Sequence, residues 1–98
     1  MGTKNNPGRW DCYANADPDE PLFVLRGQDS TASLVVTLWR AMKMEMKEQG
    51  TSQISEEKLE EARECSLALE KWAKDHGEDP SVAFKAFVNV LKRMKEDS

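Results

Sequence analysis

Cysteine and histidine are scarce: the chain of 98 residues has two cysteines and one histidine. Two cysteines are too few for the disulfide framework that stabilises many small secreted domains. Cys12, Cys65 and His76 lack the spacing of a zinc site, and His76 stands where a helix end favours a cation. The chain also lacks the GxGxxG, Walker and HExxH motifs. We therefore expect no metal, no cofactor, no catalytic residue and no enzymatic activity.

Long apolar runs are missing as well. The longest, residues 22–25, is far shorter than the roughly 20 residues that cross a membrane. No N-terminal segment has the apolar core of a secretory signal peptide. The sequence thus predicts a protein without membrane association, located in the reducing cytoplasm.

Positive charge is not in excess, because the formal net charge is -4. Binding to nucleic acid through phosphates needs an excess of Lys and Arg, so nucleic acid is not an expected partner. The charge is uneven: residues 49–79 sum to -5 and residues 80–98 to +2. We interpret these segments as solvated helix faces.

Three segments carry apolar residues at helical spacing, and they predict helices at about 31–48, 56–76 and 80–95. Cap residues support the starts: Asp29 or Ser30 for the first helix, Ser55 for the second, and Asp79 before Pro80 for the third. We predict a mainly α protein of three amphipathic helices. The expected buried faces are Val35, Leu38, Trp39, Met42 and Met46; Leu59, Ala62, Cys65, Ser66, Leu69, Trp72 and Ala73; and Phe84, Phe87, Val88, Leu91 and Met94.

The N-terminal third is an irregular arm, because Pro18, Pro21 and Gly27 prevent a long helix. Residues 1–8 are polar and turn-rich, and we expect a flexible terminus there, followed by one helical domain over 9–98. Residues 22–25 are a candidate short strand, either paired with the same segment of a second copy or packed as irregular chain over the helices. The high aromatic content favours a homo-oligomer.

Residues 9–33 concentrate side chains that are typical of recognition sites. Flat aromatic rings stack on bases, Arg donates paired hydrogen bonds to phosphate, and a helix start attracts anions. We predict a site for a phosphorylated small molecule here; in the alternative, the aromatic residues only fix the arm to the helices and Ser30 only caps. The predicted ligand-binding residues are Arg9, Trp10, Tyr13, Arg26, Gln28, Ser30, Thr31 and Ser33.

The same segment resembles short uncharacterised proteins encoded by phages and prophages. The resemblance rests on Trp10-Asp11-Cys12-Tyr13, on Asp19-Glu20-Pro21-x-Phe23-x-Leu25 and on Asp29-x-x-Ala32, about a quarter of the chain. Small helical phage proteins include sponges, oligomers that sequester the nucleotide signals of bacterial immunity. The resemblance implies an anti-defence protein in the host cytoplasm, with no residue roles transferred.

The first functional hypothesis is therefore a non-catalytic, homo-oligomeric binding protein that sequesters a phosphorylated nucleotide signal. The alternative is an acidic protein–protein inhibitor that blocks a basic host surface through Glu56, Glu57, Glu60, Glu61 and Glu64. A nucleic-acid binder would use Lys85, Lys92, Arg93 and Lys95, and the net charge opposes it.

Overall fold

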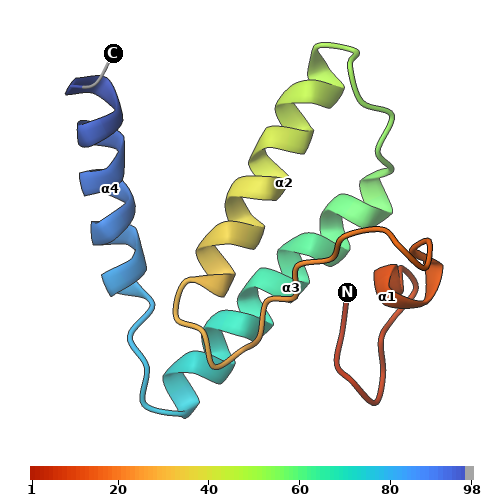
Figure 1. Cartoon of the computed structure of the whole chain (residues 1–98), viewed down its shortest axis with the longest axis horizontal. Helices are drawn as coiled ribbons and strands as arrows, with labels where there is room; N and C mark the ends of the chain where they lie inside the picture. The colour runs from red at the N-terminus through yellow and green to blue at the C-terminus, as the bar shows by residue number, and fades with distance from the viewer. Residues whose placement is uncertain (97–98) are drawn as a thin grey trace.

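A computed structural model of the chain describes residues 1–96 and shows four helices in this part, α1 to α4 (Figure 1). The predicted mainly α fold with three long helices is confirmed, and each helix begins and ends within one residue of its expected position. Residues 97 and 98, the end of the expected 9–98 domain, lie outside the described part. The helices are α1 (Cys12–Asn15), α2 (Ala32–Glu48), α3 (Glu56–Asp75) and α4 (Ser81–Glu96).

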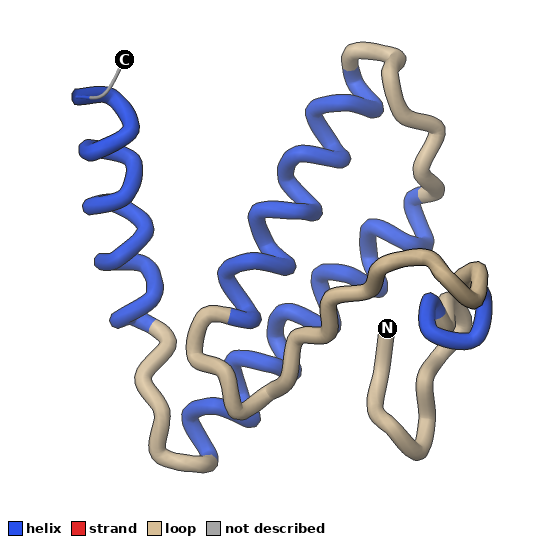
Figure 2. The backbone as a smooth tube through the Cα atoms, in the orientation of Figure 1, coloured by secondary structure: helices blue, strands red, loops and turns tan. Residues whose placement is uncertain are grey.

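The candidate strand at residues 22–25 does not form, and these residues are loop (Figure 2). No backbone hydrogen bond joins them to another segment of residues 1–96. Phe and Val favour extended chain, but a strand needs a neighbouring strand to satisfy its backbone groups. Within one copy, the alternative of irregular chain running over the helices is the one observed.

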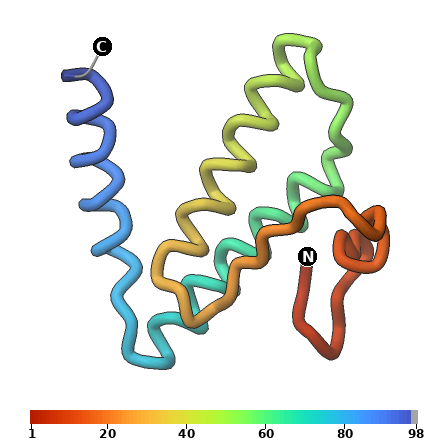
Figure 3. Tube along the Cα trace, viewed as in Figure 1, coloured from red at the N-terminus to blue at the C-terminus, as the bar shows by residue number. Residues whose placement is uncertain are grey.

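Helices α2 and α3 form a hairpin, and they are the one pair of helices with an extensive contact in the described chain (Figure 3). Its buried residues are mostly small: Ala32 on α2, and Leu59, Ala62 and Ala73 on α3. Small side chains let the two backbones approach closely. The Arg40 Nε donates a hydrogen bond of 2.9 Å to the Leu59 carbonyl oxygen and adds a polar link.

The ends of the hairpin follow the sequence signals. Ser55 caps α3, because its hydroxyl accepts a hydrogen bond of 3.1 Å from the Lys58 N–H. Gly50 ends α2 with a φ of 80°, a left-handed conformation that glycine adopts without strain. Thr51 N–H then donates to the Met46 carbonyl oxygen at 2.8 Å.

Helix α4 stands apart from the hairpin and joins it through a short link after α3 (Figure 1). The sequence predicted a buried face on α4, and this part of the prediction is wrong for a single copy. Phe84 is 59% exposed, Leu91 44% and Met94 63%. Trp72 at the end of α3 was also expected inside and is 52% exposed. Phe87 and Val88 on the same predicted face are half-buried, so the described chain covers this apolar face of α4 only in part.

The arm crosses the hairpin along α3, from the start of that helix to its last turns (Figure 1). Residues 3 and 6 close a turn through backbone hydrogen bonds of 2.9 and 3.2 Å. The Met1 amine donates to the Trp10 carbonyl oxygen at 2.7 Å and lies 3.4 Å from the Glu61 carboxylate. None of the helices within residues 1–96 combines the length and apolar character needed to cross a bilayer.

Candidate functional site

The predicted ligand-binding residues fall into two groups, and Arg9, Trp10 and Tyr13 form the first. The Arg9 guanidinium makes an ion pair with Glu57 in the first turn of α3 and lies 4.9 Å from the centre of the Trp10 ring. Trp10 is half-buried, whereas Tyr13 on α1 is 80% exposed. Arg9 therefore already has an anionic partner and an aromatic one.

Arg26, Gln28, Ser30, Thr31 and Ser33 form the second group, at the opposite end of α3. The Asp29 N–H donates to the Arg26 carbonyl oxygen at 3.0 Å and closes a turn. The Arg26 side chain is exposed, and its guanidinium has no ion pair within residues 1–96. This turn thus offers an unpaired cation to solvent.

Gly27 fixes the same turn against Trp72. A Cβ atom added to Gly27 would lie 2.7 Å from Cδ1 of the Trp72 ring, so the backbone touches the indole. The other neighbour of Trp72 is His76, whose ring is stacked on it with centroids 4.2 Å apart and planes at 17°. Arg26 therefore lies next in sequence to a glycine that contacts an aromatic pair.

The distance along α3 separates the two groups. Glu57 contacts Arg9 and Trp72 contacts Gly27. Trp72 comes fifteen positions after Glu57, and at 1.5 Å per residue this separation is about 22 Å along the helix. One chain does not bring Arg9 and Tyr13 to the same small molecule as Arg26, so the predicted site is divided.

The start of α2 is already occupied by a carboxylate. Asp29 Oδ1 accepts hydrogen bonds from the Thr31 N–H at 2.9 Å and from the Thr31 hydroxyl at 2.6 Å. These two bonds lower the pKa of Asp29 below its usual value, so the group is ionised at neutral pH. Asp29 stands two residues before Thr31, the N-cap of α2, and its negative charge opposes a second anion at this helix start.

Ser33 faces a cleft at the base of the hairpin, where the start of α2, the second half of α3 and the start of α4 meet. The cleft has a volume of ≈ 500 Å³. Its charged groups are mutually compensated, since Lys74 lies 2.9 Å from Glu70 and Asp79 accepts from the Ser81 hydroxyl at 2.7 Å. The cleft is lined by Ser33, Leu34, Thr37, Ser66, Leu67, Glu70, Lys74, Asp79, Pro80, Ser81 and Phe84.

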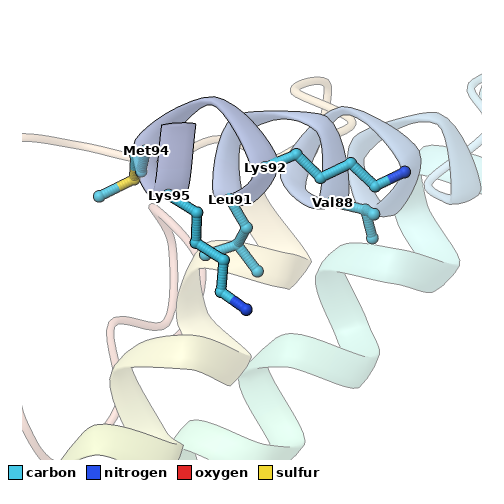
Figure 4. A pocket seen from close by; sticks show the side chains of 5 residues that line it. All are labelled: Val88, Leu91, Lys92, Met94 and Lys95. Carbon is cyan, nitrogen blue, oxygen red and sulfur yellow. The ribbon is translucent and has the colours of Figure 1, made fainter. Parts of the chain in front are cut away.

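A second hollow is a groove of ≈ 340 Å³ along the last turns of α4 (Figure 4). Val88, Leu91 and Met94 give it an apolar floor, and the stems of Lys92 and Lys95 flank it. Such a surface has no group that would activate a substrate, and it fits an apolar side chain better than a charged ligand.

The acidic side of α3 is largely neutralised by neighbouring cations. Glu56 lies 2.8 Å from Lys47 Nζ, Glu57 pairs with Arg9, and Glu60 lies 3.4 Å from Arg63. The pKa of Glu56 is lowered by its hydrogen bond to Lys47. The predicted acidic surface is therefore less negative than its composition suggests.

Sequence reasoning missed the pair formed by Trp72 and His76. Trp72 lies on the apolar stripe of α3, and this spacing gives no sign that half of the side chain is exposed. His76 was expected near the helix end, where its Nδ1 now lies 2.8 Å from the Trp72 carbonyl oxygen. The contact with Gly27 joins segments 45 residues apart in sequence, and no local pattern reveals it.

Groups able to ligate metal or act as nucleophiles are dispersed. Across residues 1–96, no three His, Cys, Asp or Glu side chains gather as a metal site would require. Burial raises the pKa of the half-buried Cys65 thiol, which keeps it protonated. A comparison of the chain with protein-family models, curated proteins and solved structures finds no match in any of the three.

Proposed function

We propose that this chain is a non-catalytic binding protein that captures a phosphorylated small molecule bearing a flat ring, with Arg26 as the phosphate ligand. One observation carries the proposal: the Arg26 guanidinium is exposed and unpaired beside a turn that Gly27 holds against Trp72. Arg donates paired, charge-assisted hydrogen bonds to phosphate oxygens, and indole rings stack on bases.

The nearby charges leave Arg26 available. Asp29 comes three residues after Arg26 in the same turn, and its carboxylate accepts hydrogen bonds from Thr31. Lys74 is paired with Glu70 and Lys71 lies 2.6 Å from Asp75, so these lysines contribute little net charge. A bound phosphate would therefore depend on Arg26 more than on any lysine of α3.

The resemblance of residues 10–32 to phage and prophage proteins supports a biological setting for this binding. A small protein that holds a cyclic oligonucleotide or an ADP-ribose derivative without transforming it would act as a sponge in the host cytoplasm. The acidic-inhibitor alternative is less favoured, because Glu56, Glu57 and Glu60 already have cationic partners.

Isothermal titration of the full chain against cyclic di- and trinucleotides and ADP-ribose derivatives tests the proposal. We expect one ligand class to bind, and Arg26→Ala to weaken it about 10- to 100-fold, the value of a charge-assisted hydrogen bond. Arg9→Ala is the matched control, since Arg9 is paired at the far end of α3 and its loss leaves affinity unchanged. Flat traces across the whole panel, or equal losses in both variants, would remove the proposal.

A further inference from the structure

Within residues 1–96, helix α4 has no extensive contact with another helix. It has 16 residues, little more than the roughly 12–15 below which isolated helices are marginal in water. Its first turn is anchored, because Ala83 is 5% exposed. Beyond Ala83 the helix diverges from the hairpin (Figure 1). A contact outside the single chain would therefore add stability to α4.

The surface that needs this contact is the apolar face of α4, which we define as Phe84, Phe87, Val88, Leu91 and Met94. These residues follow a helical repeat, so they share one side of the helix. Phe84 and Met94, at its two ends, are 59% and 63% exposed. A shallow groove on this side is lined by Val88, Leu91 and Met94 (Figure 4).

The single chain exposes more surface than a folded monomer of its mass. Its accessible area is 7863 Å², whereas a compact monomer of this mass exposes about 5,650 Å². Its radius of gyration is 15.0 Å, against about 12.6 Å for a compact domain of this length. The excess of about 2,200 Å² exceeds the roughly 800 Å² that each partner buries in a standard interface. The arm and the hairpin contribute part of this area, and α4 is the long helix without an extensive contact to another helix within residues 1–96.

Charge indicates which partner and which orientation fit. The approach to α4 is acidic, with Glu78 and Asp79, and its last turns are basic, with Lys92 and Arg93. When two copies of α4 lie side by side and antiparallel, the basic end of each helix lies near the acidic start of the other. The two helix dipoles then also point in opposite directions, which is the favourable arrangement. A parallel pair would place Lys92 and Arg93 beside their own copies.

We propose that this chain forms a homodimer in which the apolar faces of two α4 helices pack antiparallel across a two-fold axis. Such an interface is self-complementary, as two-fold symmetry requires. The inference does not depend on any ligand, and the dimer forms even if Arg26 binds nothing.

Sedimentation velocity of the full chain at high micromolar concentration tests the dimer. We expect twice the chain mass of 11.1 kDa for the natural sequence. Leu91→Asp should give the single-chain mass, because it places a charge in the centre of the apolar face. Asn89→Asp is the matched control: it adds the same charge on the opposite, exposed side of α4 and leaves the dimer intact. A natural chain that stays at 11.1 kDa, or a Leu91→Asp variant that stays dimeric, would overturn the inference.

Cysteine crosslinking tests the orientation without disrupting the face by charge. In a background with Cys12→Ser and Cys65→Ala, Phe84→Cys and Met94→Cys are made as separate proteins, then mixed and oxidised. The antiparallel pair predicts a covalent dimer in the mixture and none in either protein alone. A covalent dimer formed within each protein alone, with none added by mixing, would show a parallel pair and refute this arrangement.

Discussion

The α2·α3 hairpin and α4 are built from the same kind of sequence but bury different amounts of it. Each helix has an apolar side at helical spacing and a cap signal at its start. The hairpin buries Leu59 to 3% exposure although Met42 on α2 stays 59% exposed, whereas in α4 no large residue is buried and Phe84 and Met94 are more than half exposed. Amphipathic spacing therefore identifies the side of a helix that packs against something else, but it does not identify the packing partner.

The difference follows from small residues. Ala62 and Ala73 on α3 and Ala32 on α2 let the hairpin helices approach until these three side chains lose almost all exposure. On α4 only Ala83, in the first turn, plays this part. The helix then carries Phe84 and Phe87, which are too large to let the hairpin follow at the same close distance.

The largest expected loss of folding stability comes from a substitution in the hairpin core. Among residues 1–96, Leu59 is the one large side chain that is almost fully buried. Leu59→Ala removes it, and core Leu→Ala substitutions cost about 2–5 kcal/mol. For a chain of this size that is much of the total stability. We expect Leu59→Ala to be largely unfolded at 37 °C, measured as the midpoint of urea unfolding by far-UV circular dichroism.

Leu91→Ala is the corresponding substitution in α4, and its effect on stability can be compared with that of Leu59→Ala. In dilute protein we expect a much smaller loss than for Leu59→Ala, because Leu91 is 44% exposed in the single chain. If two copies pair through α4, the loss grows with protein concentration, since dimerisation stabilises the folded state by mass action. Equal losses for the two variants at low concentration would contradict the distinction drawn between the helices.

Much of the fold could be predicted from the sequence because its signals are local. Helical spacing, the Ser55 cap and the Gly50 stop act within a few residues, and all three helices begin and end where these signals place them. The position of α4 could not be predicted in this way. It depends on whether distant residues can approach closely, which no short pattern expresses.

The candidate site could be predicted only in part, for the same reason. The sequence placed Arg9, Tyr13 and Arg26 within one segment, and closeness in sequence was taken for closeness in space. The arm instead runs beside α3, so Arg9 reaches Glu57 while Gly27 reaches Trp72. For the start of α2 the sequence offered Asp29 or Ser30 as the cap. The N-cap is Thr31, and Asp29 accepts a hydrogen bond from its N–H.

A moderate loss of stability is expected when the capping side chain of α3 or of α4 is removed. Ser55→Ala removes the side-chain acceptor of the Lys58 N–H and should cost about 1 kcal/mol of global stability, since α3 belongs to the packed hairpin. Asp79→Ala removes the acceptor of the Ser81 N–H at 3.0 Å, but α4 is not part of that core. Amide hydrogen exchange should then show local opening confined to α4. Faster exchange throughout α3 in the Asp79 variant would mean that the two regions unfold together.

The smallest expected effect is the response of the α4 cap to acid. Hydrogen bonds from the Ser81 hydroxyl and N–H, helped by Lys85 and Lys74, lower the pKa of Asp79 below its ordinary 3.8. Because the folded-state pKa is the lower one, the cap contributes fully above 3.8 and its contribution is lost as pH falls through the folded value. We expect the Asp79 carboxyl, followed by NMR, to titrate below 3.8. Asp79→Asn keeps a hydrogen-bond acceptor that acid does not protonate, so the α4 amide signals of this variant should lose the pH-dependent change. A midpoint at or above 3.8 would show that α4 frays before its cap is protonated, and the helix would then be weaker than its hydrogen bonds indicate.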